Sequence, residues 1–587
     1  MRCFFLHAGE KGAERFAERL VFPHGRKLPA DGPWDAVIRY GALAPEPAEP
    51  VLLGRIAPLL RVKKGQTAGE LLRQCGLKTA GRLAAGTGRP GGRGRVWKRP
   101  GAAGNLEARG GEAGRPEGAD GRRSGGEESR QRAGEIMNRA AERMEETGGD
   151  RPSFGAAESG EAARHSAGTA ALPSAGPACV WEFRIPVFQL DALAVYARRM
   201  APPGSGVLMR RKERAFRELP EAERHHRASR AVRDAVRAVY TLGLDYGLVT
   251  LVSTADGDTL ICEVDAEPDL AAPWAERLAD AMNRFAAEDW PERPELLLGA
   301  DPEFVLRGPD GRVVPASRFL ERQGKVGCDA VILSGHRVIL PLAELRPDPS
   351  PDAAGLVQGL RRTMRAAARK LPGGEELAWQ AGGMPVKGLP LGGHIHFSGM
   401  PLASALLRAL DNYCALPLLL LEGEGSHRRR PRYGRLGDCR RKCHGGFEYR
   451  PLPSWLASPE LAAGVLALAR TVALHWRELR QDPLQHPGLR QHYYRGEADP
   501  LRPAAAGLWA ELESLAAYRE QAGELAWLKR ALFAAPPPGG LIDAAGDFRA
   551  AWGIGPTDYP AACEPPAAAG SRPFTAVSAA SQAVLFV

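Results

Sequence analysis

The sequence predicts an α+β protein in which an antiparallel sheet, with helices on one face, follows an α/β domain. Two observations lead to this prediction. From about residue 296, four strand-like segments each carry two polar residues two positions apart, and long helical patterns lie between them. Before that point, short apolar and polar segments alternate as in βα units. A chain of 587 residues has room for about four domains of roughly 150 residues each.

The α/β domain is expected to be split, with residues 1–80 and 176–290 on either side of an insert. In its second half, two apolar runs flank an Ala-Asp-Gly-Asp turn, which is a signal for a β-hairpin. The expected elements are a strand at 35–41, a strand pair at 180–190, a helix at 221–242 and a hairpin of 247–253 with 259–265.

The insert, residues 81–175, is rich in Gly, Arg, Glu, Ala and Ser and has few large apolar residues. Such a composition cannot bury enough surface to offset the entropy that is lost on ordering. We therefore expect a disordered linker with a short helix near residues 135–146. Its positive and negative charges nearly balance, which disfavours a dedicated nucleic-acid-binding arm.

The second domain is expected at residues 291–485, after the Pro-rich residues 290–294. A helical extension and a weakly patterned tail, residues 486–587, should follow it. The expected helices are 353–370, 403–422, 459–479 and, in the extension, 506–534.

The sequence gives no sign of a membrane or secreted protein. No apolar run approaches the roughly 20 residues that a membrane span needs, and the N-terminus turns polar within a few residues. Nine cysteines scattered over the chain do not form a disulfide framework. We expect a cytoplasmic protein with reduced thiols and no membrane contact.

Positive charge is concentrated in one loop. The formal net charge is +10, and residues 428–442 alone hold eight basic residues against one acid, Asp438. This basic loop predicts a polyanionic partner, either the phosphates of a nucleotide at short range or a nucleic acid.

The four polar pairs predict a polar sheet face, because strand residues two apart point to the same side. The pairs are Asp301 with Glu303, Glu344 with Arg346, His394 with His396, and Glu448 with Arg450. Apolar residues alternate with them and should face the helices. One such pair alone is more often a solvated strand face or a surface ion pair, but four in one domain favour a functional site.

Charged residues on such a face need partners, and divalent cations are one possibility. Carboxylates with an occasional imidazole suit Mg²⁺ or Mn²⁺, whereas a structural zinc site would favour Cys and His. Arginines and the basic loop supply donors for phosphate oxygens. A metal site beside a phosphate clamp indicates phosphoryl transfer.

Five motifs of this domain occur in the order that is found in a known family. They are Gly-Ala-Asp-Pro-Glu-Phe from residue 299, Ala-Glu-Leu-Arg-Pro from 343, Gly-Gly-His-Ile-His-Phe-Ser from 392, Arg-Tyr-Gly from 432 and Lys-Cys-His-Gly-Gly-Phe-Glu-Tyr-Arg-Pro-Leu-Pro-Ser-Trp from 442. Over residues 296–480 the chain resembles the phage-type carboxylate-amine ligases (COOH.NH2 ligase, type 2), amidoligases of the glutamine synthetase and glutamate-cysteine ligase superfamily.

The resemblance implies a glutamine synthetase-like sheet that binds ATP and Mg²⁺ (or Mn²⁺). It implies that Glu303, Glu344 and Glu448 hold two Mg²⁺ ions, with His394 or His396 as the histidine of the metal site. Of these two, we assign His394 to the metal and His396 to the nucleotide. The residues implied to bind ATP phosphates and the acyl phosphate are Arg346, Arg450 and one or more of the loop residues Arg432, Arg435, Arg440, Arg441 and Lys442. The resemblance leaves open which of these loop residues contact phosphate.

The implied reaction has two steps. A substrate carboxylate attacks the γ-phosphorus of ATP, and an amine then takes the acyl phosphate to give an amide, ADP and phosphate. Such chemistry needs charge neutralisation and alignment but no nucleophilic side chain. Asp329 is a candidate for orienting the amine or removing its proton, although an Asp after a glycine turn is at least as often a cap or turn residue. The resemblance leaves open whether the substrates are small molecules, peptides or proteins, and whether the chain forms a homo-oligomer.

The first domain has a fainter resemblance to ATP-grasp ligases. It depends on residues 35–41 and 61–79, on Leu-Gly-Leu-Asp-Tyr-Gly from residue 242 and on Cys-Glu-Val-Asp-Ala-Glu-Pro from residue 262. In that fold the last strand usually reads Glu-x-Asn and holds Mg²⁺, whereas this chain has Glu263, Val264 and Asp265. We therefore expect a degenerate ATP-grasp-like domain with a structural or substrate-presenting role.

Two functions of other classes stay open. One is a non-catalytic nucleotide-binding or scaffold protein on the same fold. The other, less expected, is a nucleic-acid-binding protein that uses the basic loop.

Cys439, Cys443 and His444 have the chemistry of zinc ligands, but no second Cys/His pair lies at finger spacing. The sequence has no Gly-x-x-x-x-Gly-Lys-Ser/Thr phosphate loop.

Overall fold

The computed structural model describes residues 1–30, 32, 34–47, 51–64, 66–85, 179–200, 215–288, 290, 294–332, 338–372, 377–443, 445–535, 539–543 and 546–559. By its internal contacts the chain divides into Met1–Lys98 with Pro177–Val587, which contains all of the described residues, and Arg99–Gly176, which lies wholly outside them. The helix expected near 135–146, most of the expected insert and the tail after residue 559 also lie outside them.

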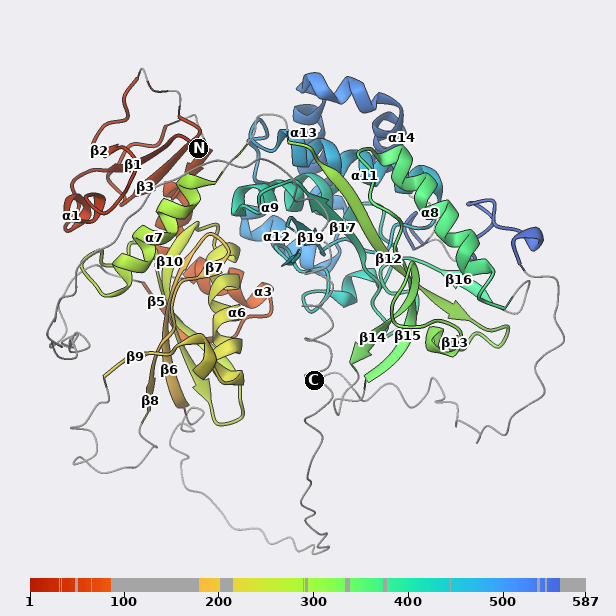
Figure 1. Ribbon diagram of the computed structural model, residues 1–587, viewed down its shortest axis with the longest axis horizontal. Helices are drawn as coiled ribbons and strands as arrows, with labels where there is room; N and C mark the ends of the chain where they lie inside the picture. Colours follow the sequence, from red (N-terminus) through yellow and green to blue (C-terminus); the bar gives the residue numbers. More distant parts are fainter. Residues whose placement is uncertain are drawn as a thin grey trace, which may run out of the picture. The chain divides into compact units, whose positions relative to one another are not determined.

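The first sheet is formed by the N-terminal segment and all of its strands run parallel (Figure 1). In the order β2-β1-β3-β4, the strands are His24–Gly25, Cys3–His7, Ala36–Tyr40 and Val51–Leu53. Helices α1 (Ala13–Ala17) and α2 (Ile56–Lys64) belong to the same segment. Every residue of β1 and β3 is buried, which is typical of parallel strands that are covered on both faces. The strand predicted at 35–41 is confirmed.

The second sheet contains the predicted hairpin, which is formed by β10 and β11. All of its strand pairs are antiparallel except β5 with β11, which run parallel. In the order β5-β11-β10-β6-β8-β9, its strands are Thr79–Ala85, Thr259–Asp265, Tyr246–Thr254, Cys179–Phe188, Tyr196–Arg199 and Arg217–Glu218, and β7 (Asp191–Ala192) pairs with β6. Its helices are α3 (Gln66–Gln74), α6 (His226–Thr241) and α7 (Trp274–Ala287).

The expected strand pair at 180–190 is wrong, because residues 179–188 form the single strand β6. On one side of this strand, β8 pairs with residues 181–184 and β7 with residues 187–188. Pro186 falls between these two ladders, where its missing N–H group leaves no ladder hydrogen bond unmade. A proline that looks like a strand breaker is therefore accommodated.

Helix α6 packs closely on the second sheet because its inner face is made of alanines. Ala228, Ala231, Ala235 and Ala238 recur at helical spacing and have no exposed surface. They contact a core that contains residues of β6, β10 and β11. The helix begins after His225, whose side chain accepts a hydrogen bond from the backbone of Ala228.

The third sheet carries the predicted polar face, and all of its neighbouring strands run antiparallel. In the order β14-β15-β12-β17-β19-β18, its strands are Val326–Ile332, Val338–Leu345, Leu297–Arg307, Gly393–Ser398, Phe447–Tyr449 and Cys439–Arg441, and β13 (Val313–Val314) and β16 (Ala378–Gln380) pair with β12. Its helices are α8 (Ala353–Ala368), α9 (Ser404–Leu410), α10 (Leu416–Leu419), α11 (Pro459–His475), α12 (Pro487–Arg495), α13 (Arg502–Ser514) and α14 (Ala522–Phe533).

The other face of this sheet is apolar and packs on helices, as predicted. Phe304, Ile395, Phe397, Phe447 and Tyr449 alternate with the polar residues and have no exposed surface. Helix α8 packs against β12, β14 and β15, and α11 packs on α8 (Figure 1). The apolar core beneath the sheet therefore holds the polar residues on the opposite side in fixed positions.

Two expected helices are interrupted. The segment expected at 403–422 is α9, a π-helical turn at Asp411–Ala415 and α10. Pro417 lies just after that turn and cannot donate the hydrogen bond that a continuous α-helix requires. The segment expected at 506–534 is two helices, α13 and α14, joined by a 3₁₀ turn at Ala516–Gln521.

None of the helices in the described ranges is both long and apolar enough to cross a bilayer.

Candidate active site

The register of the third sheet brings the predicted polar residues together on one face. Glu303 on β12 lies opposite Glu344 on β15, Asp301 lies opposite His394 on β17, and His396 lies opposite Glu448 on β19. Register partners in antiparallel strands point to the same side. Arg346 and Arg450 follow directly after the ends of β15 and β19. The four pairs therefore meet on one surface.

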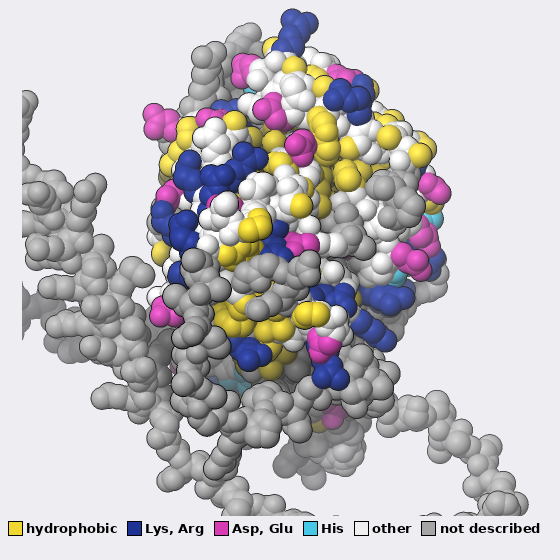
Figure 2. Space-filling view, turned by 90° about the vertical axis from the view of Figure 1, so that its right-hand side faces the viewer, with side chains coloured by type: hydrophobic (Ala, Val, Ile, Leu, Met, Phe, Trp, Pro, Cys, Tyr) yellow, Lys and Arg dark blue, Asp and Glu magenta, His cyan; other side chains and the backbone are white. Residues whose placement is uncertain are grey.

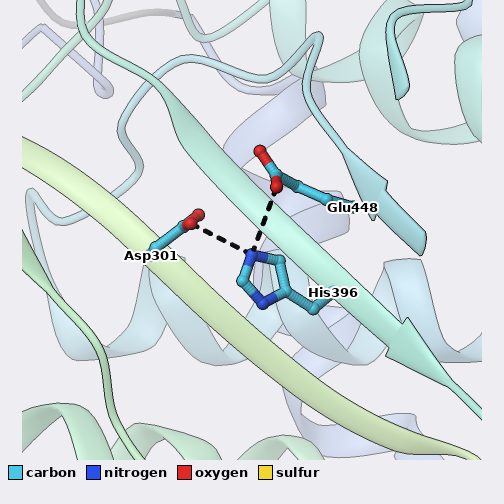
Figure 3. Close-up of side chains that lie close together, drawn as sticks. All are labelled: Asp301, His396 and Glu448. Carbon is cyan, nitrogen blue, oxygen red and sulfur yellow. Dashed lines mark ion pairs between the residues drawn. The ribbon is translucent and has the colours of Figure 1, made fainter. Parts of the chain in front are cut away.

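Two histidines and two carboxylates form the centre of this surface, and Figure 3 shows three of the four, Asp301, His396 and Glu448. Asp301 Oδ2 lies 3.1 Å from His396 Nε2, and Asp301 Oδ1 lies 3.2 Å from His394 Nδ1. Glu448 Oε2 lies 4.0 Å from His396 Nε2, and Glu448 Oε1 lies 3.6 Å from His394 Nδ1. Glu448 has no exposed surface, although it is charged at neutral pH in ordinary surroundings.

The chemistry of this group fits a divalent cation. Asp301, His396 and Glu448 each offer one ligand atom, and these atoms lie within 4.8 Å of one another. Asp301 Oδ1, His396 Nε2 and Glu448 Oε2 are buried, and the partners that lie near them among the described residues are other charged or ionisable groups of this face. Two carboxylates and an imidazole suit Mg²⁺ or Mn²⁺. The sequence indicated Asp301 only as the partner of Glu303, so its place among these ligand atoms was missed.

Both carboxylates of this group are held ionised. Burial alone would raise the pKa of Asp301, but hydrogen bonds from His394 and His396 outweigh it and place the pKa well below its usual range. For Glu448, burial and the charge of Asp301 also raise the pKa, and the Arg450 and Lys442 cations more than offset them, so the pKa is lowered. A cation site made of negative ligands is therefore available at neutral pH.

A second group of carboxyls lies beside the first. Burial raises the pKa of Glu303 well above its usual range, and the charges of Asp329 and Glu344 raise it further. Burial and the charge of Asp301 raise the pKa of Glu344 to about 8, although Arg346 pairs with it. Glu344 therefore holds a proton at neutral pH unless a cation replaces it, which is the behaviour expected of a second metal site.

Three of the predicted phosphate-binding residues border this face. Lys442 Nζ lies 2.5 Å from Glu448 Oε2, Arg440 Nη1 lies 3.6 Å from the same oxygen, and Arg450 pairs with Glu448. Arg440 is exposed, whereas Lys442 and Arg450 are half-buried. Arg440 and Lys442 reach the carboxylate from β18 and its end, and Arg450 reaches it from the end of β19, so an anion beside Glu448 would meet three cations.

The rest of the basic loop does not form a free cationic surface. Arg435 pairs with Asp438 at 2.8 Å, and Arg441 pairs with Asp191 at 2.8 Å. Arg432 lies over the ring of Tyr433 at 5.5 Å. Internal partners therefore already neutralise part of the charge of this loop, and phosphate binding by its arginines stays a prediction.

Two further arginines of this loop are structural. Arg429 is 2% exposed and donates to the backbone carbonyls of Leu391 and Pro451, the first at 3.2 Å. Arg430 pairs with Glu422 and lies over the ring of Tyr493 at 4.5 Å. Composition cannot reveal this division, since an arginine that binds carbonyl groups and one that binds phosphate look alike in a sequence.

Two glycines give the charged side chains their space. A side chain at Gly392 would overlap the His394 ring at Nε2, and the Gly392 N–H donates to Glu303 Oε2 at 2.7 Å. A side chain at Gly327 would overlap the Arg346 guanidinium. Sequence analysis missed both roles, although the glycine pair before His394 is a usable signal of close backbone approach.

The other candidates from the sequence lie elsewhere. Glu263 and Asp265 lie on β11 of the second sheet, and burial raises the pKa of Asp265 to about 6. Cys439 is on β18 and Cys443 is exposed, but His444 lies outside the described residues, so the set of three is untested.

Comparison with known proteins gives one family match. Residues 298–554 match the family model described as Phage phiEco32-like COOH.NH2 ligase-type 2. No curated protein matches the chain.

Several solved structures resemble the chain at low identity. They include ATP-grasp ligase PsnB complexed with minimal precursor, Mg and ADP, at 11% identity over 49% of this chain and 97% of that chain, with a TM-score of 0.25. A bifunctional glutathione synthetase from Pasteurella multocida matches at 12% identity over 40% of this chain and 47% of that chain, with a TM-score of 0.27. Macrocyclase MdnB from Microcystis aeruginosa MRC matches at 12% identity over 48% of this chain and 98% of that chain, with a TM-score of 0.21.

The family match covers more than the five motifs. It begins one residue after the start of β12 and runs beyond residue 480, so it takes in the polar face and helices α12 to α14. The resemblance that the motifs indicated is thus confirmed, and residues 298–554 of the chain match the phage phiEco32-like COOH.NH2 ligase-type 2 family.

Proposed function

We propose that the protein is an ATP- and Mg²⁺-dependent carboxylate-amine ligase that forms an amide through an acyl phosphate and releases ADP and phosphate. One observation carries the proposal: Asp301, His396 and Glu448 present buried ligand atoms within 4.8 Å of one another, on a face that Lys442 and Arg450 border. Cation ligands beside phosphate donors are the two parts that phosphoryl transfer needs.

Each group has a role in this proposal. Asp301, Glu448 and a histidine hold one cation, and Glu303 with Glu344 hold a second. When bound, Mg²⁺ neutralises phosphate charge and draws electron density from the γ-phosphorus. Lys442, Arg440, Arg450 and Arg346 bind phosphate oxygens and stabilise the charge of the acyl phosphate as it forms.

Asp329 is proposed to orient the amine. It lies on β14, and its charge acts on both Glu303 and Glu344, so it faces the same surface. A carboxylate there can accept a proton from an ammonium group before attack on the acyl phosphate. The carboxylate and amine substrates are proposed to belong to small molecules or peptides.

Binding of nucleic acid is less well supported than ligation. Internal partners take up much of the charge of the basic loop. On the face shown in Figure 2, Lys and Arg side chains form separate groups with apolar and acidic side chains between them. A binder that relies on the phosphate backbone usually presents a continuous basic stripe.

The test should not depend on the unknown amine. We would incubate the full chain with ATP, Mg²⁺ and candidate carboxylates in the presence of hydroxylamine, which converts an acyl phosphate into a hydroxamate. Hydroxamate and ADP in equal amounts are the expected result. Binding of Mg-ATP without any ADP release over the carboxylate panel would favour the non-catalytic alternative.

Matched variants locate the chemistry on the sheet. Glu448→Gln should abolish ADP release and weaken Mg-ATP binding measured by calorimetry. Glu424→Gln, at an exposed position, should leave both unchanged. Full activity of Glu448→Gln would remove the polar face from the proposal.

A further inference from the structure

A buried carboxyl joins three segments of the chain behind the polar face. Asp411 lies in the π-helical turn between α9 and α10 and is 3% exposed. It accepts hydrogen bonds from the Tyr240 hydroxyl at 2.8 Å and from the Tyr449 hydroxyl at 2.9 Å, and the backbone N–H of Gly437 also donates to it. One side chain therefore contacts helix α6, strand β19 and the loop before β18.

Two of these three segments carry residues of the polar face. Tyr449 follows Glu448 in β19, so the two side chains point to opposite sides of the sheet. Gly437 lies three residues before Arg440 in the chain, and Arg440 is the register partner of Glu448. Asp411 thus holds, from the apolar side, the two strands that bring the cations of β18 to this carboxylate.

The third segment belongs to the second sheet. Tyr240 lies in the last turn of α6, and its ring packs against the loop at Gly437. Gly437 has a φ of 72°, and a side chain there would overlap the Tyr240 ring. The loop before β18 can therefore approach α6 this closely only because the residue is a glycine.

A second buried contact anchors α6 beside the π-helical turn. Asp245 follows the end of α6 by four residues and pairs with Arg408 of α9 at 2.6 Å, and the two residues are 1% and 8% exposed. Arg408 precedes Asp411 by three residues. Helix α6 should therefore stay docked if the Tyr240 hydroxyl is removed, so the contribution of that hydroxyl can be measured separately.

An apolar side chain would fill the position of Asp411 at a lower energetic cost. Burial raises the pKa of Asp411 to about 7, which reflects the cost of ionising a carboxyl in the core. Replacement of buried charged groups by apolar groups of similar size is often neutral or stabilising. A carboxyl that accepts three directed hydrogen bonds has an effect that an apolar group lacks, because it fixes the relative positions of its donors.

We propose that Asp411 is a positioning residue, which fixes β18 and β19 relative to each other and ties both strands to α6. Through the backbones of these strands it positions Arg440, Lys442 and Glu448. The inference rests on the proposed function, in which these three residues bind phosphate and a cation. It adds that the second sheet supports the reaction, because α6 holds the phosphate-binding edge of the third sheet in place.

Tyr240→Phe tests the proposal because it removes one donor of Asp411 without changing a residue of the third sheet. Its matched control is Tyr246→Phe, in which the lost hydroxyl is also buried and donates to the Arg39 carbonyl at 2.7 Å. Calorimetry on the full chain should show that Mg-ATP affinity falls about tenfold in Tyr240→Phe and stays unchanged in the control. Tyr449→Phe, which removes the other hydroxyl, should behave like Tyr240→Phe.

Hydrogen exchange measured by mass spectrometry gives a second readout, which does not depend on ATP. Peptides that contain β18 or β19 should exchange about tenfold faster in Tyr240→Phe than in the wild type, and at the wild-type rate in Tyr246→Phe. Unchanged exchange of these peptides in both Tyr240→Phe and Tyr449→Phe would overturn the proposal. Faster exchange with unchanged Mg-ATP affinity, or an equal loss of affinity in Tyr246→Phe, would overturn it as well. If the wild type binds no Mg-ATP while exchange responds as expected, the proposed function fails and the positioning of the two strands is supported.

Discussion

Glu303 on β12 and Glu344 on β15 lie directly opposite each other, and burial raises the pKa of both carboxyls. The value for Glu344, about 8, means that it holds a proton at pH 7 when no cation is bound. A cation that binds there must release this proton. Metal binding and proton release should therefore be coupled at this pair.

We expect Mn²⁺ binding at pH 7 to release about one proton per ion at this site. Calorimetric titrations in two buffers with different ionisation enthalpies measure the number directly. Glu344→Gln should reduce both the release and the affinity, because an amide is a poor ligand for a hard cation and carries no proton to lose. Titrations that give the same enthalpy in both buffers would show that Glu344 is ionised before the metal arrives.

The lack of a side chain at Gly392 is predicted to matter for the metal site. In Gly392→Ala the new methyl group overlaps the His394 ring, which must move away from Asp301 and Glu448. We expect Mn²⁺ affinity to fall by at least about tenfold, as is typical when an outer partner of a metal site is disturbed. Gly523→Ala, in α14 where nothing lies within 4 Å of the added methyl, should leave affinity unchanged and slightly raise the melting temperature. Unchanged affinity in Gly392→Ala would mean that His394 lies outside the metal site.

Substitution of two arginines of the basic loop should affect two different properties, protein stability for Arg429 and Mg-ATP binding for Arg440. Arg429→Met leaves the buried carbonyls of Leu391 and Pro451 without a donor, so it should destabilise the protein by about 2–4 kcal/mol. Arg440→Met removes an exposed side chain beside Glu448, so it should weaken Mg-ATP binding with little change in stability. Chemical unfolding followed by tryptophan fluorescence and calorimetry with Mg-ATP compare the two. A stable Arg429→Met variant with impaired ATP binding would reverse this assignment.

The polar face could be predicted from the sequence because it depends on local rules. Alternation along a strand assigns Asp301 and Glu303 to one side, and Phe304 to the other, without knowledge of the partner strands. Four such segments in one domain then have to share a sheet if their apolar sides are to be buried together. The structure confirms that inference residue by residue.

The partners of single charges could not be predicted, because they depend on long-range contacts. Arg408 and Asp245 are 163 positions apart in the sequence, and nothing near either residue indicates the other. The same holds for Arg441 and Asp191. A basic run in a sequence gives the sum of its charges, but only the fold shows which of them are already neutralised.

Asp411 provides a pH-dependent test of the core behind the polar face. It is buried in the π-helical turn and accepts hydrogen bonds from Tyr240 at 2.8 Å and from Tyr449 at 2.9 Å. Tyr449 follows Glu448 on β19, and Tyr240 lies on α6 of the second sheet. Burial raises the pKa of Asp411 to about 7, although both tyrosine hydroxyls lower it.

The folded protein therefore holds this proton more tightly than the unfolded chain, in which an aspartate has a pKa of about 4. The contribution to stability is complete below about pH 4, falls as the pH rises toward 7 and then levels off, with a slope of at most about 1.4 kcal/mol per pH unit. Asp411→Asn cannot ionise, so its melting temperature should fall less than that of the wild type between pH 5 and pH 7.5. Thermal unfolding of both proteins at several pH values measures the difference, and Asp499→Asn, at a side chain that is 92% exposed, is the control. Parallel curves for Asp411→Asn and wild type would show that Asp411 is ionised in the folded protein throughout this range, which would require a donor stronger than the two tyrosines.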